Sequence, residues 1–225
     1  MDYQQLKHFG EIYTGKVSPG IMMSLFTSLP KELGFIGTPK FMLKMQNREA
    51  YWKKQSLTSV TERNITNTEL LDSVKYSLAF YNALEAVCGK KKALDAYLKL
   101  TTPLGVRMDE EFFPTAQDFL RCPDPWEAFK RYMFEFFSVS MREGVFRFEV
   151  LDDTDTDLHF HVTDCAWYAI WKEAGHPEVM GASSAVEMLF YPALCGAMGC
   201  SIKRDEGWIC RGDSVCDWHF YHSEV

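Results

Sequence analysis

Residues 145–162 read VFRFEVLDDTDTDLHFHV, and this stretch decides the fold. From Phe146 to Val150, aromatic and aliphatic residues alternate with charged ones, which is the period of a half-buried β-strand. The acidic run 152–157 predicts a turn, and Leu158–Val162 alternates again. We therefore predict an antiparallel β-hairpin in the middle of the chain.

The residues before this hairpin predict helices. Thr66-Asn67-Thr68-Glu69 has the pattern of a capping box, and the apolar residues after it recur at helical spacing until Gly89 supplies a stop. Asp124-Pro125-Trp126-Glu127 predicts another helix start, with an Asp cap and Pro at the first helical position. Residues 1–143 are therefore expected to form a helical region, in which Lys90-Lys91-Lys92 is a solvated helix start.

Residues 144–225 are expected to form an α+β region rich in cysteine and histidine, packed with the helical region as one compact unit. Two helices are predicted at about 164–174 and 184–198. A hairpin with strands around 200–210 and 215–222 then closes the chain. The predicted fold class is α+β: a helical N-terminal half packed on a C-terminal ββααββ unit with an antiparallel sheet.

The composition narrows the class of function. A chain of 225 residues with 47% hydrophobic residues can bury a large core, and its net charge of −7 disfavours binding to nucleic acid or to an anionic membrane. The start MDYQQLKHFG lacks the features of a secretory signal, no stretch has the apolar length of a membrane span, and seven irregularly spaced cysteines favour reduced thiols. We expect a cytoplasmic protein with a small-molecule substrate and neither nucleic acid nor membrane as partner, and homo-oligomer formation stays open.

Cys165 is the strongest candidate for chemistry. Asp164 is a predicted helix cap, so the thiol would lie in the first helical turn, where free N–H groups and the helix dipole favour a thiolate. The alternative is a buried cysteine that acts as a small hydrophobic side chain. Cys195, Cys200 and Cys210 are expected to serve packing.

His159 and His161 lie two residues apart on a predicted strand, so their rings point to the same face. With Cys165 they could form a His/His/Cys metal site, or His161 could supply a general base. Ordinary solvent exposure is the alternative for this polar face. The primary expectation is a protein without metal or other cofactor.

Glu187 has two interpretations. Ser184-Ala185-Val186-Glu187 has the pattern of a capping box, but a carboxylate that turns inward could act as an acid or base. In the last strand, one face is expected to point toward a core or pocket and the other away from it; the first carries Cys216, Trp218 and Phe220, and the second carries Asp217, His219 and Tyr221. Gly212 in Arg211-Gly212-Asp213 predicts a tight turn with a positive φ.

Four stretches resemble the L-2-amino-thiazoline-4-carboxylic acid hydrolase family. They are Val162-Thr163-Asp164-Cys165, Glu173-Ala174-Gly175-His176-Pro177-Glu178, Ala193-Leu194, and Gly212-Asp213-Ser214-Val215-Cys216-Asp217-Trp218. By spacing from Ala193-Leu194, however, a family Cys falls on Glu187 and a family Asp on Tyr191. The Thr-rich strand of the family is replaced here by residues 203–208. These departures imply a substrate or chemistry that differs from the family's.

The resemblance implies a hydrolase, or a related lyase, that opens a small ring containing sulfur and nitrogen by attack of water or a thiolate on an amidine-like carbon. Cys165 would be the nucleophile or another key site residue, and Glu187 or His161 its acid–base partner. The side chains expected to line or brace the substrate site are Tyr191, Cys216, Asp217 and Trp218. The same layout also resembles small-molecule-binding domains of the 4-vinyl reductase type, which implies a noncatalytic sensor as the alternative. The familiar serine-hydrolase, nucleotide-binding and zincin motifs are absent from the sequence.

Overall fold

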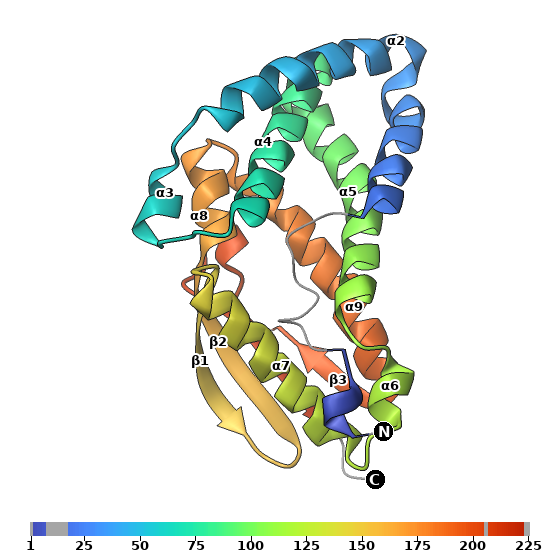
Figure 1. The fold of residues 1–225 in the computed structure, drawn as a ribbon, viewed down its shortest axis with the longest axis vertical. Coiled ribbons are helices and arrows are strands. Elements are labelled where there is room, and N and C mark those ends of the chain that lie inside the picture. The colour runs from blue at the N-terminus through green and yellow to red at the C-terminus, as the bar shows by residue number, and fades with distance from the viewer. Residues whose placement is uncertain (1, 8–17, 205–206, 223–225) are drawn as a thin grey trace.

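The computed structural model describes residues 2–7, 18–204 and 207–222. It confirms the α+β class, with helices in the first part of the chain and a four-stranded antiparallel sheet in the last part (Figure 1). The first part comprises η1 (Tyr3–Gln5), α2 (Pro19–Lys53), α3 (Thr58–Glu62), α4 (Thr68–Cys88), α5 (Lys90–Phe112), α6 (Ala116–Leu120) and α7 (Pro125–Arg142). The second comprises β1 (Phe146–Asp153), β2 (Asp157–Cys165), α8 (Ala166–Glu173), η2 (Pro177–Met180), α9 (Gly181–Met198), β3 (Cys200–Lys203), η3 (Ile209–Arg211) and β4 (Cys216–His222). The order of its strands and α-helices is the predicted ββααββ.

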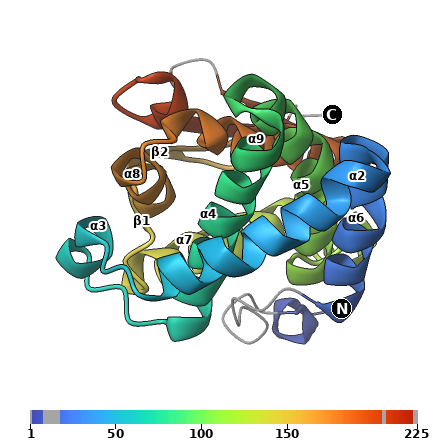
Figure 2. The same cartoon turned by 90° about the horizontal axis from the view of Figure 1, so that it is seen from above.

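The long helix α2 is broken at Gly34, where φ is 70° and the helical hydrogen bonding cannot continue. Its first half lies beside α5 and its second half crosses α4 (Figures 1 and 2). Phe41 from the second half packs edge-on against Phe80 of α4, with 5.0 Å between ring centroids. The break thus lets one helix cover two neighbours.

The helix starts follow local chemistry. Asp124 caps α7 as predicted, because its side chain accepts the backbone N–H of Glu127 at 2.9 Å. The cap of α4 is Asn67, whose side chain accepts the N–H of Leu70 at 3.0 Å, so the predicted box beginning at Thr66 is wrong by one residue. Gly89, with φ of 78°, ends this helix as predicted.

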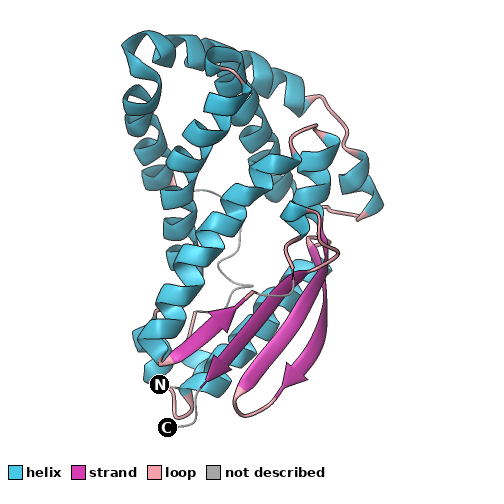
Figure 3. Cartoon of the chain, turned by 180° about the vertical axis from the view of Figure 1, so that it is seen from behind, coloured by secondary structure: helices cyan, strands magenta, loops and turns pink. Residues whose placement is uncertain are grey.

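The sheet has the strand order β1-β2-β4-β3, and α7 and α9 cover the same face of it. Phe137 of α7 lies 4.3 Å from Phe160 of β2, and Tyr191 of α9 lies 4.9 Å from Trp218 of β4, both measured between ring centroids. We call this the inner face. Figure 3 shows the outer face, in front of which no helix of the described residues lies.

A β-bulge decides which way Cys165 points. The register of β1 against β2 shifts next to Arg147, which leaves Thr163 as an extra residue on β2. Cys165 consequently faces the inner side together with Val162, although strict alternation would place it on the outer side with His161.

The start of α8 corrects one prediction. The strand β2 runs through Cys165, so α8 begins only at Ala166. Asp164 does not cap it, because its carboxylate accepts two hydrogen bonds from the Arg63 guanidinium, at 3.0 and 2.7 Å. Cys165 is the residue before the helix and not a member of its first turn.

Two further boundaries differ from the predictions. Helix α9 begins at Gly181, so Ser184 and Glu187 lie inside the helix and do not form a capping box. Strand β3 ends at Lys203, and η3 occupies part of the segment expected to continue it to residue 210. Among the described residues, Pro177–Met198 is the one helical stretch long and apolar enough to cross a membrane by composition, a property that core helices share; α9 packs here against α5, α6 and β3.

Candidate functional site

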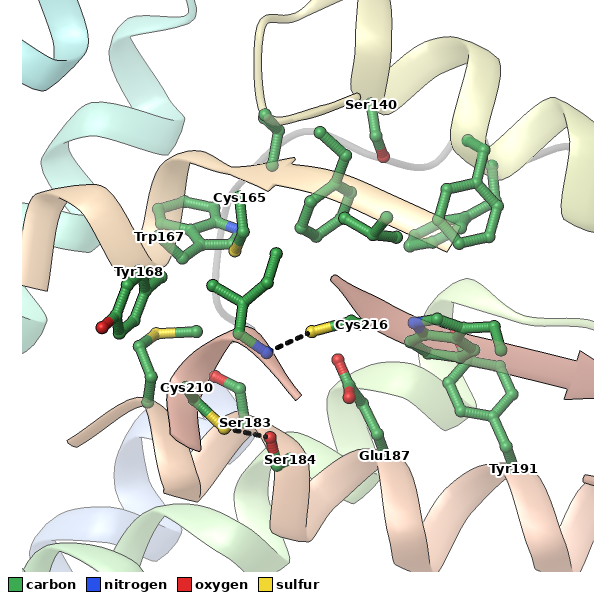
Figure 4. A pocket seen from close by; sticks show the side chains of 18 of the residues that line it. Ser140, Cys165, Trp167, Tyr168, Ser183, Ser184, Glu187, Tyr191, Cys210 and Cys216 are labelled. Atoms are coloured by element: carbon green, nitrogen blue, oxygen red, sulfur yellow. Dashed lines mark hydrogen bonds between the residues drawn. The ribbon is translucent and has the colours of Figure 1, made fainter. Parts of the chain in front are cut away.

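A cavity of about 190 Å³ lies between the inner face of the sheet and helices α7, α8 and α9 (Figure 4). Much of its wall is aromatic, with contributions from Phe137, Trp167, Tyr191 and Trp218. It shares Ser183 with a larger groove of about 620 Å³ between α2, α4, α5 and α9. The cavity is smaller than the 300–1,000 Å³ typical of sites for drug-sized ligands, which suits it to a small molecule.

Two thiols line this cavity, one from β2 and one from β4. Cys165 is 8% exposed, and its burial raises its pKa to about 12, against a smaller opposing effect from backbone N–H groups at the start of α8. Burial also raises the pKa of Cys216, whose sulfur accepts the N–H of Ile209 at 3.2 Å. The expected stabilisation of a Cys165 thiolate by the helix start is therefore wrong, because desolvation outweighs it and leaves the thiol protonated at neutral pH.

Glu187 turns inward from α9 (Figure 4). Its carboxylate pairs with the guanidinium of Arg204. The Arg204 side chain is 2% exposed and lies between the rings of Trp208 and Trp218, 4.0 and 4.4 Å from their centroids. Burial raises the pKa of Glu187, and the positive charge of Arg204 partly offsets this. Of the two interpretations of Glu187, the inward carboxylate is the one that the structure contains.

Asp109 adds a second carboxyl group to the cavity. Burial, together with a smaller effect from the charge of Glu187, raises its pKa to about 8. Burial, followed by the charges of Asp109 and Glu187, also raises the pKa of Tyr191 well above its usual value. Among the described residues that line the cavity, Arg204 is thus the one cation and pairs with Glu187, while Asp109 is a second carboxyl group close enough to sense the charge of Glu187.

Sequence reasoning missed Asp109, Arg204 and Cys210. Asp109 is one acid of the run Asp109-Glu110-Glu111 in a polar helix, and no local pattern distinguishes the inward member. Arg204 lies in the stretch that departs from the family pattern, which was the available signal. Cys210 was expected to serve packing, but it lines the cavity with its sulfur 3.2 Å from the hydroxyl of Ser184.

The turn after η3 holds Cys210 in place. Gly212 has φ of 100°, as predicted, and the Asp213 carboxylate accepts the backbone N–H of Trp208 at 2.8 Å. The Gly-Asp part of the C-terminal motif therefore closes the loop that carries one wall of the cavity. Cys195 and Cys200, by contrast, are buried outside the cavity, where the Cys200 thiol donates to the Cys195 carbonyl.

The structure places His161 and Asp217 on the outer face of the sheet, away from the cavity. They are register partners on β2 and β4, and Asp217 Oδ1 lies 2.7 Å from His159 Nε2 and 3.6 Å from His161 Nε2. The expected position of His161 beside Cys165 is therefore wrong. Asp217 points away from the cavity, as the alternation of the last strand predicted, so it does not line the substrate site and could only brace it. The alternative His159–His161–Cys165 metal set is not formed, because the bulge turns Cys165 to the inner face.

The family model of the L-2-amino-thiazoline-4-carboxylic acid hydrolases matches residues 70–220, well over half of the chain. The chain belongs to this family. The match extends from α4 to β4 and so includes the helices that close the cavity as well as the sheet. A search of curated proteins finds no match, and a search of solved structures finds none either.

The family's name describes hydrolysis of a thiazoline carboxylic acid. Two of the positions at which the sequence was expected to depart from the family pattern, Glu187 and Tyr191, line the cavity, and so does Arg204 from the departing stretch 203–208. Three residues that match the pattern, Cys165, Cys216 and Trp218, line it as well. The cavity is thus lined both by residues that match the family pattern and by residues that differ from it.

Proposed function

We propose that this protein is a hydrolase, or a related lyase, that opens a small sulfur- and nitrogen-containing ring or cleaves an amide-like bond. The observation that carries the proposal is the convergence of a thiol, Cys165, and a carboxyl group of raised pKa, Glu187, on one small cavity. The charge of Glu187 contributes to the raised pKa of Cys165, so the two groups are close enough to influence each other's protonation.

In this mechanism Cys165 is the nucleophile and Glu187 the acid–base group. Because the Cys165 thiol is protonated at neutral pH, attack on an amidine-like carbon requires a base, and the Glu187 carboxylate takes the proton. Glu187 then returns the proton to the ring atom that leaves. A water molecule, deprotonated in turn by Glu187, releases the product and restores the thiol.

The remaining cavity residues have supporting roles in the proposal. Arg204 favours the ionised form of Glu187, since its charge and its hydrogen bond oppose the larger effect of burial on the pKa of that carboxyl group. Tyr191, Trp218 and Cys216 bind the substrate through aromatic and sulfur contacts. Glu187 and Tyr191 replace a thiol and a carboxyl group of the family pattern, so we propose a substrate that differs from the thiazoline in the family's name.

The test is turnover of a panel of five-membered ring compounds, beginning with 2-amino-thiazoline-4-carboxylate, followed by release of free thiol and by mass spectrometry of the product. Cys165→Ala is expected to abolish turnover and Glu187→Gln to lower kcat on the order of 10²–10⁴-fold. Cys122→Ala is the matched control, because Cys122 is also buried but lies in a loop after α6, away from the cavity. Full activity of Cys165→Ala would overturn the proposal.

A noncatalytic small-molecule-binding module is the second candidate. The aromatic wall and the protonated thiols favour it, because such a cavity can hold an apolar ligand without reacting with it. Saturable binding of a panel compound that leaves it chemically unchanged would support this candidate over the hydrolase. We also propose a cytoplasmic location, a proposal supported by the seven cysteines, all of which are free thiols.

A further inference from the structure

We propose that His159, His161 and Asp217, on the outer face of the sheet, form a binding site for a divalent transition-metal ion, with Zn²⁺ as the best fit. Among the residues that the structure describes, this is the group of three or more His, Cys, Asp or Glu side chains whose ligand atoms all lie within 4.8 Å of one another. Two imidazoles and a carboxylate are ligands that zinc and its neighbours in the first transition series accept.

The distances fit such an ion. A tetrahedral zinc with bonds of 2.0–2.2 Å places its ligand atoms roughly 3.3 Å apart. The two distances from Asp217 Oδ1, 2.7 Å to His159 Nε2 and 3.6 Å to His161 Nε2, bracket this value. All three ligand atoms lie within 4.8 Å of one another, so one ion placed between them could contact all three after side-chain adjustment.

The backbone fixes these side chains before any metal binds. His161 is the direct register partner of Asp217, and His159 is the partner of His219, in a regular antiparallel pair of central strands. The His219 ring stacks on the His159 ring, with 4.6 Å between their centroids. Asp157 holds His219 in turn, with 2.7 Å between its Oδ1 and His219 Nε2, so the stacked pair restrains the His159 ring. Ligands held this firmly lose little conformational freedom on binding, which favours affinity.

Burial and charge also favour a cation. The Asp217 side chain is 2% exposed, whereas those of His159 and His161 are 17% and 18% exposed, so an ion would enter past the imidazoles and meet a desolvated carboxylate. Glu149 on β1 is the register partner of His161 from the other side and shares its face. It adds a further, exposed carboxylate to the same face.

The proposed site and the cavity lie on opposite faces of the same two strands, β2 and β4. Along β2 and β4 the inner-face neighbours of His161 and Asp217 are Val162, Cys216 and Trp218, which line the cavity. An ion that joins β2 to β4 on the outer face would therefore brace the cavity wall without contacting a ligand inside it. The proposal stands on the geometry of the outer face and does not depend on the proposed hydrolase activity.

Titration calorimetry with ZnCl₂ tests the proposal on full-length protein that carries no affinity tag and has been stripped with a chelator. We expect about one equivalent to bind and to raise the melting temperature. His161→Gln and Asp217→Asn should each weaken binding at least 10–100-fold, the range seen even for loss of outer-shell partners. Co²⁺ in place of Zn²⁺ should give visible absorption bands that these two variants lack.

Two controls make the outcome decisive. His222→Gln removes a histidine of the same strand whose ring lies 5.8 Å from that of Trp126, outside the cluster, and should leave Zn²⁺ affinity unchanged. Cys165→Ser should also leave it unchanged, whereas a His/His/Cys site would lose affinity. Circular dichroism shows whether a variant has folded. Weak binding that is equal in wild-type protein and both ligand variants would mean a hydrogen-bonded cluster only and would overturn the proposal.

Discussion

The buried Arg204–Glu187 pair makes the sharpest stability prediction. Arg204→Met keeps an unbranched apolar side chain between Trp208 and Trp218 but removes the one cation among the described residues that line the cavity. The variant leaves the Glu187 carboxylate without its ion-pair partner. It also removes the hydrogen bond that Arg204 Nε donates to the backbone carbonyl oxygen of Asp217 at 2.9 Å. Breaking one side of a buried ion pair costs about 3–5 kcal/mol, which sets the expected loss in the free energy of unfolding at neutral pH.

The pH dependence follows from the same pair. Arg204 lowers the pKa of Glu187, so its removal raises that pKa further above the ordinary value of 4.5. The folded variant then binds a proton that the unfolded chain has released, so its stability falls as pH rises above about 4.5. We therefore expect the deficit of Arg204→Met relative to wild type to be larger at pH 7.5 than at pH 5.

Guanidinium unfolding, followed by tryptophan fluorescence and circular dichroism at both pH values, measures these quantities. The double variant Glu187→Gln/Arg204→Met removes both charges and should recover most of the loss, with a coupling energy of about 2 kcal/mol or more. Arg107→Met is the control, because Arg107 is exposed and its loss should change stability by less than about 0.5 kcal/mol. A deficit under about 1 kcal/mol, equal at both pH values and not relieved in the double variant, would refute the reasoning.

Three further predictions concern the cavity and the neighbouring groove. Asp109→Asn mimics the protonated carboxyl group. Because the raised pKa of about 8 makes wild-type stability fall between pH 4 and 8, the variant should be more stable than wild type at pH 9 and nearly equal to it at low pH. Equal melting curves of the two proteins at pH 9 would contradict this prediction. Gly105→Ala should destabilise by roughly 1–3 kcal/mol, since a Cβ there would lie 2.5 Å from Val186 on α9, and Val186→Ala should relieve the loss in a chemical unfolding experiment. An additive double variant would place the effect elsewhere. Peptide mass mapping can measure the rate at which iodoacetamide alkylates Cys165. This rate should be low at pH 7 and should rise about tenfold per pH unit up to pH 10, because the pKa of Cys165 is about 12. A rate that stops rising below pH 9 would show that the thiolate already dominates there.

Local patterns predicted the elements that depend on local chemistry. The cap at Asp124, the stop at Gly89 and the two faces of the last strand follow from hydrogen bonds or side-chain periods within a few residues. The fold class followed from the change of period near residue 145. These features need no knowledge of what packs against them.

The errors arose where a distant residue decides the outcome. Arg63 engages Asp164, so that carboxylate cannot cap the following helix. The burial of Asp109 depends on how α5 meets α9, which no local period reveals. The pKa of Cys165 depends on the closed cavity around it, whereas the helix-start argument considered only its own segment.

The adjacent pair Cys216-Asp217 shows how one short motif can serve two sites. On a strand, successive side chains point to opposite faces, so a motif that specifies both residues specifies something on each side of the sheet. Cys216 lines the cavity on the inner face, and Asp217 meets His159 and His161 on the outer face. Asp217→Asn weakens the contact with His159 and should lower stability whether or not the two faces are coupled. If the two faces act independently, the folded variant should still bind a cavity ligand with wild-type affinity. Weaker ligand binding by the folded variant would show that the motif couples the two faces through the backbone of β4.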